Sequence, residues 1–226
     1  IVAAPAEEAM HFVIVRSSEL GCEPLCPQWI AARGQITADS PKAFGKALKD
    51  VKGARLPVVF DSAGGDFDAA LALGRIIHEK VLETAIAATA YAICGPHDKG
   101  CTAKKRKSAL FKGTIAQQGT CASACVFALA GGKRRFTAAS PNVSLFNPAA
   151  YSSRQKQAVT EQIAGYLKEM HFDDRLLTMM RNAAAAKPMV LSSDEVDEVG
   201  LAAKHLRANT LQDMRECRKT IAAPNC

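Results

Sequence analysis

A serine and a pair of glycines have the types and positions needed for acyl-transfer chemistry. Ser123 lies in the segment GTCASACVFALAGG at residues 119–132, and Gly64 and Gly65 end the segment DSAGG at residues 61–65. A hydrolase needs a nucleophile near the start of a helix and free backbone N–H groups that face it. Glycines leave their N–H groups unobstructed, although a purely structural glycine turn would have the same sequence.

Each of these segments must be positioned by a strand before it and a helix after it. Residues 56–60 are a short apolar run that precedes DSAGG, and apolar residues recur at helical spacing over 67–80. Residues 114–117 predict a strand and 123–129 a helix that ends at Gly131-Gly132. Repeated strand, turn and helix units predict an α/β fold with crossover connections.

The rest of the chain supplies further elements of both kinds. Strands are expected from the apolar and β-branched runs, and helices from the periodic segments with capping residues. The expected strands are 12–15, 84–93, 134–137 and 143–146, with a strand-like stretch within 22–36. Ser40 is the expected N-cap of a helix to about 51, and Ser192 or Ser193 caps a short helix through 198. The other expected helices are 153–171, 173–185 and 209–220.

Length and composition predict one domain with a tail. The chain has 226 residues, of which 48% are hydrophobic and 6% aromatic, which suits aliphatic strands and alanine-rich helices. We expect a flexible N-terminal segment (1–9), an α/β domain (10–203) and a C-terminal helix and tail (204–226). A basic, cysteine-closed insertion is expected at 94–112.

Eight cysteines fall into four local couples, which favours disulfides formed in an oxidising compartment. A zinc site competes with this interpretation, but the two CxxxC spacings have no partnering histidine pair. The couple 121/125 is the least certain, since positions four apart inside a regular helix rarely have disulfide geometry. The couples are Cys22 with Cys26, Cys94 with Cys101, Cys121 with Cys125, and Cys217 with Cys226.

The compartment is inferred from the cysteines alone. The sequence starts at Ile1 and contains no apolar run of membrane-spanning length. From the cysteines we expect a periplasmic or otherwise exported protein. From the start at Ile1 we expect any signal peptide or N-terminal membrane anchor to have been removed.

The net charge of +7 is concentrated partly in one basic run. Such a run could contact an acidic membrane surface, although a solvated loop is the favoured interpretation. No aromatic residues interleave with the charges, so we predict no nucleic-acid function. The run is Lys104, Lys105, Arg106 and Lys107.

The two segments resemble the Clp peptidase and crotonase superfamily when they are taken together. In the Clp family the turn reads Ser-Pro-Gly-Gly, and the nucleophile segment reads Gly-x-Ala-Ser-Met before an apolar helix that ends in Ala-Gly. Here residues 62–65 read Ser-Ala-Gly-Gly and residues 119–125 read Gly-Thr-Cys-Ala-Ser-Ala-Cys. The resemblance extends over about residues 10–203, because the order of elements, Arg135-Phe136 and residues 193–201 also match the family. Residues 22–30 resemble an uncharacterised periplasmic branch of the superfamily in bacteria.

The resemblance implies a nucleophile and two oxyanion donors. Ser123 falls on the family nucleophile, and the amides of Gly65 and Ala124 fall on its oxyanion donors. The family histidine falls on Phe146, which cannot accept a proton, and the family aspartate falls in residues 187–191 around Pro188, where no acid stands. The resemblance also implies self-association, since its families form rings or stacked trimers.

Without a base, a serine hydroxyl is a poor nucleophile at neutral pH. A Ser-Lys dyad with Lys156 or Lys168 could replace the family base, and His171 is a weaker candidate. Cys121 or Cys125 could act as a thiol nucleophile, but oxidation would silence it. The acidic pairs at 173–174 and 194–195 fit helix starts better than paired carboxylates.

Three functions remain open from the sequence. The first is an exported Clp-like protein whose degenerate peptidase site binds a peptide or partner. The second is a working serine hydrolase that uses Ser123 with a lysine base. The third, acyl-CoA chemistry of the crotonase type, needs a cytosolic cofactor, and the cysteines argue against it. We expect no cofactor and no metal.

Overall fold

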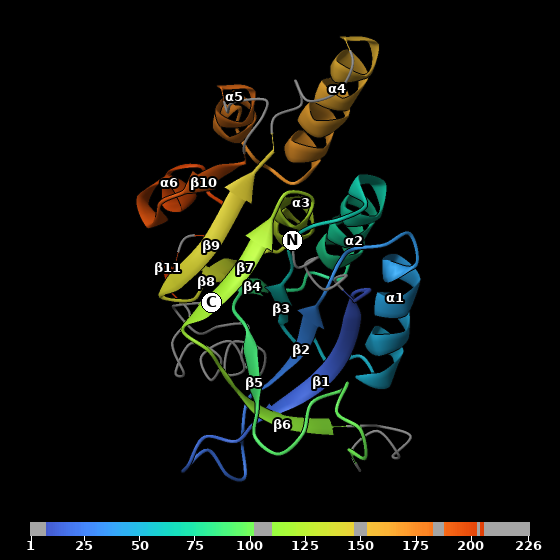
Figure 1. Cartoon of the computed structure of the whole chain (residues 1–226), viewed down its shortest axis with the longest axis vertical. Helices are drawn as coiled ribbons and strands as arrows, with labels where there is room; N and C mark the ends of the chain where they lie inside the picture. The colour runs from blue at the N-terminus through green and yellow to red at the C-terminus, as the bar shows by residue number, and fades with distance from the viewer. Residues whose placement is uncertain (1–7, 102–109, 147–152, 183–187, 203, 206–226) are drawn as a thin grey trace, which may run out of the picture.

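The computed structural model describes residues 8–101, 110–146, 153–182, 188–202 and 204–205 (Figure 1). The basic run at 104–107, the helix expected at 209–220 and the couple Cys217–Cys226 therefore lie outside the described residues.

Two sheets and six described helices make up the fold. The larger sheet has the strand order β11-β8-β4-β3-β2-β1-β6-β5, and the smaller has the order β10-β9-β7. The larger sheet comprises β1 (His11–Ser17), β2 (Gln28–Arg33), β3 (Val58–Asp61), β4 (Thr84–Ile86), β5 (Thr89–Tyr91), β6 (Leu110–Ile115), β8 (Arg135–Thr137) and β11 (Lys204–His205). The smaller comprises β7 (Gln118–Ala122), β9 (Ser140–Leu145) and β10 (Met189–Leu191). The helices are α1 (Ser40–Asp50), α2 (Phe67–Glu79), α3 (Cys125–Ala130), α4 (Ser153–Glu169), α5 (Arg175–Asn182) and α6 (Ser193–Glu198).

The centre of the larger sheet is parallel. Strands β2, β3, β4 and β8 run in one direction, and β1 pairs with β2 in the opposite direction. Parallel neighbours need crossover connections, and α1 and α2 provide them between β2, β3 and β4. The predicted α/β class with crossover connections is confirmed.

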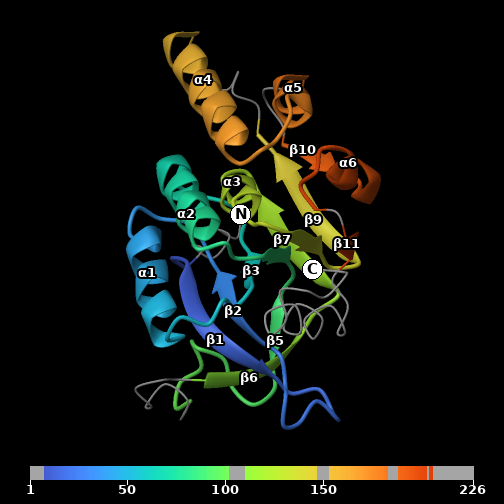
Figure 2. The same ribbon diagram turned by 180° about the vertical axis from the view of Figure 1, so that it is seen from behind.

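Helices α1, α2 and α3 lie along one side of the larger sheet, as Figures 1 and 2 show from opposite directions. The larger apolar core lies on this side and includes the fully buried side chains of Phe60 and Phe127. A smaller core around Trp29 and Phe111 covers the opposite side of the sheet. Among the described residues, no helix has both the length and the apolar character needed to cross a membrane.

Local capping explains where two of the helices begin. The Asp66 carboxylate accepts the Ala69 N–H at 2.7 Å and starts α2 immediately after the glycine pair. Ser192 and Glu195 form a reciprocal capping box at α6, which confirms the predicted cap. Ser40 was expected to cap α1 but is its first helical residue; Asp39 holds the N-cap position without a side-chain bond.

Two strand predictions were wrong. Residues 84–93 form two short strands, because β4 pairs with β3 and β8 whereas β5 turns away to pair with β6. Of the strand expected at 114–117, residues 114–115 end β6 and residues 116–117 connect it to β7, which belongs to the smaller sheet. This division matters because β7 leads directly to Ser123.

Candidate active site around Ser123

Ser123 occupies a tight turn between a strand and a helix. It follows the last residue of β7, and its φ is +53°. A non-glycine residue in this left-handed region is strained, and such residues cluster at functional sites. The Ser123 N–H donates to the Ser144 C=O at 2.8 Å, which fixes the turn against β9. The side chain is only partly buried.

A disulfide spans this turn. Cys121 on β7 is bonded to Cys125 at the start of α3, and their Cα atoms are 5.2 Å apart, within the range that disulfides bridge. The expectation that a shared regular helix would disfavour this couple was wrong, because Cys121 belongs to a strand and the chain turns at Ser123. Both cysteines have no exposed surface.

The predicted couples Cys22–Cys26 and Cys94–Cys101 are also disulfides. In the part of the chain that the structure describes, no cysteine is free. The thiol nucleophile considered from the sequence is therefore absent from both positions beside Ser123.

The glycine turn (residues 62–65) lies directly against Ser123. A Cβ atom on Gly64 would lie 2.7 Å from the Ala122 oxygen and 2.9 Å from the Ser123 Cβ. Gly64 also has a φ of +109°, which other residues rarely adopt. Only glycine fits here, and the fold thereby brings together the two segments that the sequence pointed to.

Two backbone N–H groups near this contact are available to a ligand. The Ile36 N–H donates to the Gly64 C=O, and the Ile36 C=O accepts from the Asp66 N–H. Gly65 lies between these two hydrogen bonds in a parallel bridge, so its own N–H points away from Ile36. Among the described residues, none accepts a hydrogen bond from the N–H of Gly65 or Ala124. These are the two groups that the resemblance assigns as oxyanion donors.

The Ser62 hydroxyl holds the glycine turn in place. It donates to the Gly34 C=O at 2.6 Å and accepts the Gly64 N–H at 3.2 Å. The Ser62 backbone pairs with β7, donating to the Thr120 C=O at 2.8 Å. The turn is therefore tied to β2 on one side and to the strand that carries Ser123 on the other.

Apolar side chains stand at the positions assigned to the base and the acid. Phe146 follows the last residue of β9, two residues beyond Ser144, and its ring lies 6.1 Å from that of Phe67 and 6.0 Å from that of Phe127. Met189 pairs with Leu145, so one further step of the antiparallel register sets Pro188 opposite Phe146. The two assigned positions are thus neighbours beside the Ser123 turn.

Helix α4 runs parallel to α2, and two contacts fix their alignment. Gln162 donates to the Asp68 carboxylate at 2.9 Å near the start of α2, and Arg75 bonds Glu169 at 3.0 Å further along. The start of α2 adjoins the glycine turn, so the first turns of α4 extend past the Ser123 end of α2.

The two candidate lysines lie on different faces of α4. Lys156 is also exposed, but it lies two helical turns before the fully buried Ile163 and so on the same side of the helix. Lys168 is exposed beside the Arg75–Glu169 pair and faces away from the buried stripe. Neither lysine bonds the Ser123 hydroxyl, and no other described side chain does.

His171 lies far from Ser123. It is exposed, has a φ of +61°, and its ring contacts that of His78 at 5.7 Å near the end of α2. Ser123 adjoins the other end of α2, roughly 15 Å away along the helix. Within the described ranges, no three His, Cys, Asp or Glu side chains are arranged to hold a metal ion.

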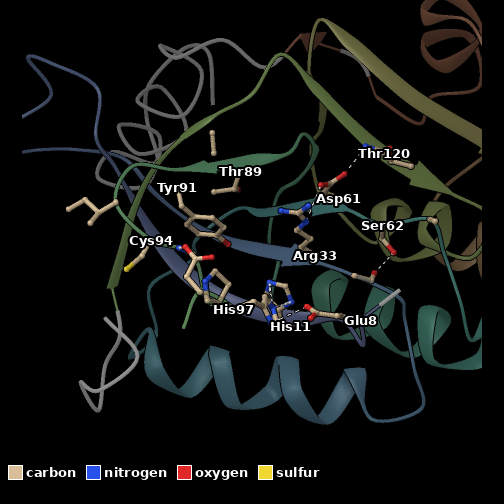
Figure 3. A pocket seen from close by; sticks show the side chains of 17 residues that line it. Glu8, His11, Arg33, Asp61, Ser62, Thr89, Tyr91, Cys94, His97 and Thr120 are labelled. Carbon is tan, nitrogen blue, oxygen red and sulfur yellow. Dashed lines mark hydrogen bonds and ion pairs between the residues drawn. The ribbon is translucent and has the colours of Figure 1, made fainter. Parts of the chain in front are cut away.

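A polar pocket of about 920 Å³ opens on the other side of the glycine turn (Figure 3). It lies where β2 and β3 end, and we call it the carboxyl-edge pocket. Ser62 and Ala63 form part of its wall, whereas Ser123 does not line it. Its ionisable side chains include Glu8, His11, Arg33, Asp61, Tyr91 and His97.

Three of these side chains form a chain of contacts. The Nδ1 atom of His97 lies 2.9 Å from the Glu8 carboxylate, and its Nε2 atom lies 3.0 Å from Nδ1 of His11. Burial, together with the nearby charges of His97 and Arg33, lowers the pKa of His11 to about 4, although Glu8 acts in the opposite direction. His11 is therefore neutral at physiological pH.

This pocket was not predicted from the sequence. His11 and His97 match no motif, and Glu8 lies in a segment that was expected to be flexible. One signal was present: Arg33 and Asp61 each end a parallel strand, and ligands of α/β proteins often bind at that edge of the sheet.

No family model and no curated protein matches the chain. Among solved structures, ClpP1 from Listeria monocytogenes is similar with a TM-score of 0.50 and 12% identity, over 76% of this chain and 87% of ClpP1. A mutant of the 1510-N membrane-bound stomatin-specific protease is similar with a TM-score of 0.51 and 15% identity, over 81% of each chain. At such low identities the likeness establishes the fold, which is that of the Clp peptidases.

Proposed function

We propose that this protein uses its Clp peptidase-like fold to bind an extended peptide or partner segment at the Ser123 turn, with a peptidase site that has lost the family base and acid. The observation that carries the proposal is Phe146, whose ring packs against Phe67 and Phe127 beside the turn. An aromatic hydrocarbon there cannot take the serine proton.

The free N–H groups of Gly65 and Ala124 supply the binding chemistry. A peptide carbonyl that accepts from them would satisfy two donors that have no partner among the described residues. The partly buried aromatic side chains of Phe67 and Phe146 would offer apolar contact beside that carbonyl. The strained Ser123 conformation is then retained because it positions the Ala124 amide.

Catalysis and binding can be tested separately. We expect a fluorophosphonate probe to label the wild type at about the rate of an unactivated serine. That labelling rate is lower by orders of magnitude than the rate for an enzyme with a complete triad. Rapid labelling that disappears in Ser123→Ala would overturn the claim of a degenerate site.

Binding can be read at the two amides themselves. On titration with a mixture of extended peptides, we expect the amide NMR signals of Gly65 and Ala124 to shift, both in the wild type and in Ser123→Ala. The Gly45 amide in α1 is the internal control and should not shift. Shifts confined to other regions would contradict the proposed binding mode.

A second candidate function, a Ser-Lys hydrolase, is favoured by the face of α4 on which Lys156 lies. If Lys156 is the base, Lys156→Met should abolish casein turnover, whereas Lys168→Met, on the other face of the same helix, should leave it unchanged. Turnover no higher than in Ser123→Ala would remove this candidate.

Export and self-association are parts of the same proposal. Three disulfides in the described chain support folding in an oxidising compartment. Assembly into a homo-oligomer is expected from the resemblance to the Clp family, and sedimentation velocity of the full chain would test it. A monomer at micromolar concentration would contradict it.

A further inference from the structure

The carboxyl-edge pocket contains hydrogen-bond donors without acceptors. The Tyr91 hydroxyl is buried and has no partner among the described residues. Burial raises the pKa of Tyr91 to about 12, so the hydroxyl keeps its proton at neutral pH. A buried hydroxyl without a partner costs about 1–3 kcal/mol, which a bound acceptor would recover.

Two more donors face the same pocket. The Arg33 side chain is 58% exposed and has only a loose ion pair, in which its Nε lies 3.7 Å from the Asp61 carboxylate. Its charge acts on both Tyr91 and His11, and all three side chains line the pocket. Thr89 accepts the Trp29 indole N–H at 3.0 Å and keeps its own proton to donate.

Each acidic side chain of the pocket, in contrast, has at least one donor partner already. Asp61 accepts the Thr120 N–H at 3.1 Å and pairs with Arg33. Glu8 lies 2.9 Å from His97, and Asp98 accepts the Gly95 N–H at 2.7 Å. The unpaired Tyr91 hydroxyl and the loosely paired Arg33 guanidinium therefore favour a ligand that supplies acceptor atoms.

The walls of the pocket indicate the rest of the ligand. The Tyr91 ring and Ile93, whose side chain is largely exposed, give the pocket an apolar side next to the donors. The Cys94–Cys101 disulfide closes the loop that carries this side. Figure 3 shows the Tyr91 hydroxyl directed toward the region between Arg33 and the two histidines.

We propose that the carboxyl-edge pocket binds an organic carboxylate, with Arg33 and Tyr91 donating to its oxygens and its apolar part against Tyr91 and Ile93. The planar guanidinium matches a carboxylate in a bidentate pair. The carboxylate displaces the loose contact of Arg33 with Asp61, which contributes little at an exposed site. This site is independent of the proposed function at Ser123, since the residues that bind the ligand do not contact Ser123.

Calorimetric titration of the full chain with butyrate at neutral pH tests the proposal, with butyramide as the neutral isostere. We expect butyrate to bind and butyramide to bind at least about ten-fold more weakly, because a charged acceptor strengthens each hydrogen bond. Equal affinity for the two compounds would overturn the proposal. So would inorganic phosphate binding more tightly than butyrate, since the apolar wall would then contribute nothing.

Two variants and a matched control assign the binding groups. Tyr91→Phe removes only the hydroxyl, and we expect about ten-fold weaker butyrate binding with a melting temperature that is unchanged or higher, because an unsatisfied polar atom is lost. Arg33→Gln should weaken binding by at least about ten-fold, whereas Arg55→Gln, at an exposed position in another loop, should not. Unchanged butyrate affinity in both pocket variants would contradict the proposal.

A last comparison distinguishes two sources of the carboxylate. An acetylated dipeptide with a free carboxyl end is titrated beside its amidated form. Tighter binding of the free dipeptide than of butyrate would identify the end of a peptide chain as the ligand, and the reverse order would identify a small acid. Either order of these affinities supports the carboxylate site. Equal binding of the free and amidated dipeptides would show that the pocket does not recognise the carboxyl end of a peptide.

Discussion

The two sides of the glycine turn differ sharply in chemistry. On one side Ser123 has a strained, nucleophile-like conformation, but the side chains at the assigned partner positions are Phe146 and Pro188. On the other side the carboxyl-edge pocket gathers ionisable side chains around Arg33 and His11, without a nucleophile. One side therefore has a strained turn with free backbone amides, while ionisable side chains gather on the other.

This difference shows which parts of the site depend on the fold and which on individual side chains. The strained turn, the free amides and the glycine contact come from the backbone and from close packing between β7 and the glycine turn. The resemblance assigns the base and the acid to single side-chain positions, directly after β9 and directly before β10. The predictions below change one side at a time.

The largest effect is expected at Gly64. Gly64→Ala would set a Cβ 2.7 Å from the Ala122 oxygen at a φ of +109°, so we expect a loss of about 3 kcal/mol or more in the free energy of unfolding. Gly45→Ala in α1, where a Cβ meets nothing within 4 Å, should instead stabilise by about 0.5–1 kcal/mol. Urea denaturation measures both, and a neutral Gly64→Ala would show that the contact is not tight.

Restoring ionisable groups beside Ser123 should reduce the difference between the two sides. We expect Phe146→His combined with Pro188→Asp to raise the rate of fluorophosphonate labelling of Ser123 by about 100-fold, the typical contribution of a positioned general base. The same pair of changes in a Ser123→Ala background is the control and should show no labelling. An unchanged rate would mean that these positions do not reach the hydroxyl.

Removal of the disulfide at the turn should have a smaller effect on stability. Replacing both Cys121 and Cys125 by Ala is expected to cost about 2 kcal/mol from the entropy of a short closed loop. The Cys22–Cys26 pair has the same sequence separation of 4 and is the matched control. Only the change at Cys121 and Cys125 should weaken peptide binding at Ser123, and equal effects on binding would contradict the positioning role.

The smallest effect is expected from His11, and it depends on pH. Its pKa is about 4 in the folded chain against an ordinary value of 6.5, so as the pH falls from about 6.5 the unfolded chain takes up a proton before the folded chain does. Stability should therefore fall as the pH falls toward about 4. The groups that face His11 are Glu8, Arg33 and His97.

His11→Asn should flatten this dependence, measured as the urea midpoint between about pH 7 and 5. His171→Asn, at an exposed position outside the pocket, is the control and should keep the slope of the wild type. A wild-type slope in His11→Asn would show that other groups cause the pH dependence.

Helices and their starts were predictable from the sequence because the signals are local. The periodic segments gave α2 and α4 nearly to their ends, and Ser192 marked the start of α6. Strand β7 was missed, and β5 was predicted only as part of one longer strand with β4, because these strands are short and contain Thr, Ala and Gly rather than alternating apolar residues. Their positions depend on pairing with distant strands, which local patterns do not encode.

The parts of the candidate site also differ in how far they could be predicted from the sequence. The glycine turn follows a strand that the sequence reveals, and Ser123 lies in a segment that resembles a known motif, so both could be found from the sequence. The carboxyl-edge pocket brings Glu8 and His97 together from segments far apart in the chain, and only the folded sheet defines that contact. The unpaired Tyr91 hydroxyl is a property of burial and has no sequence signal.

The disulfide at the Ser123 turn also has a consequence for the order of events during biosynthesis. A thiol is oxidised only where an oxidant can reach it, and in the folded chain neither Cys121 nor Cys125 has any exposed surface. The bond must therefore form while the segment is still open, before α3 is packed into the core. A copy that finishes folding among reductants would carry Ser123 on an untied turn, so the place where the chain folds decides which form of the site it has.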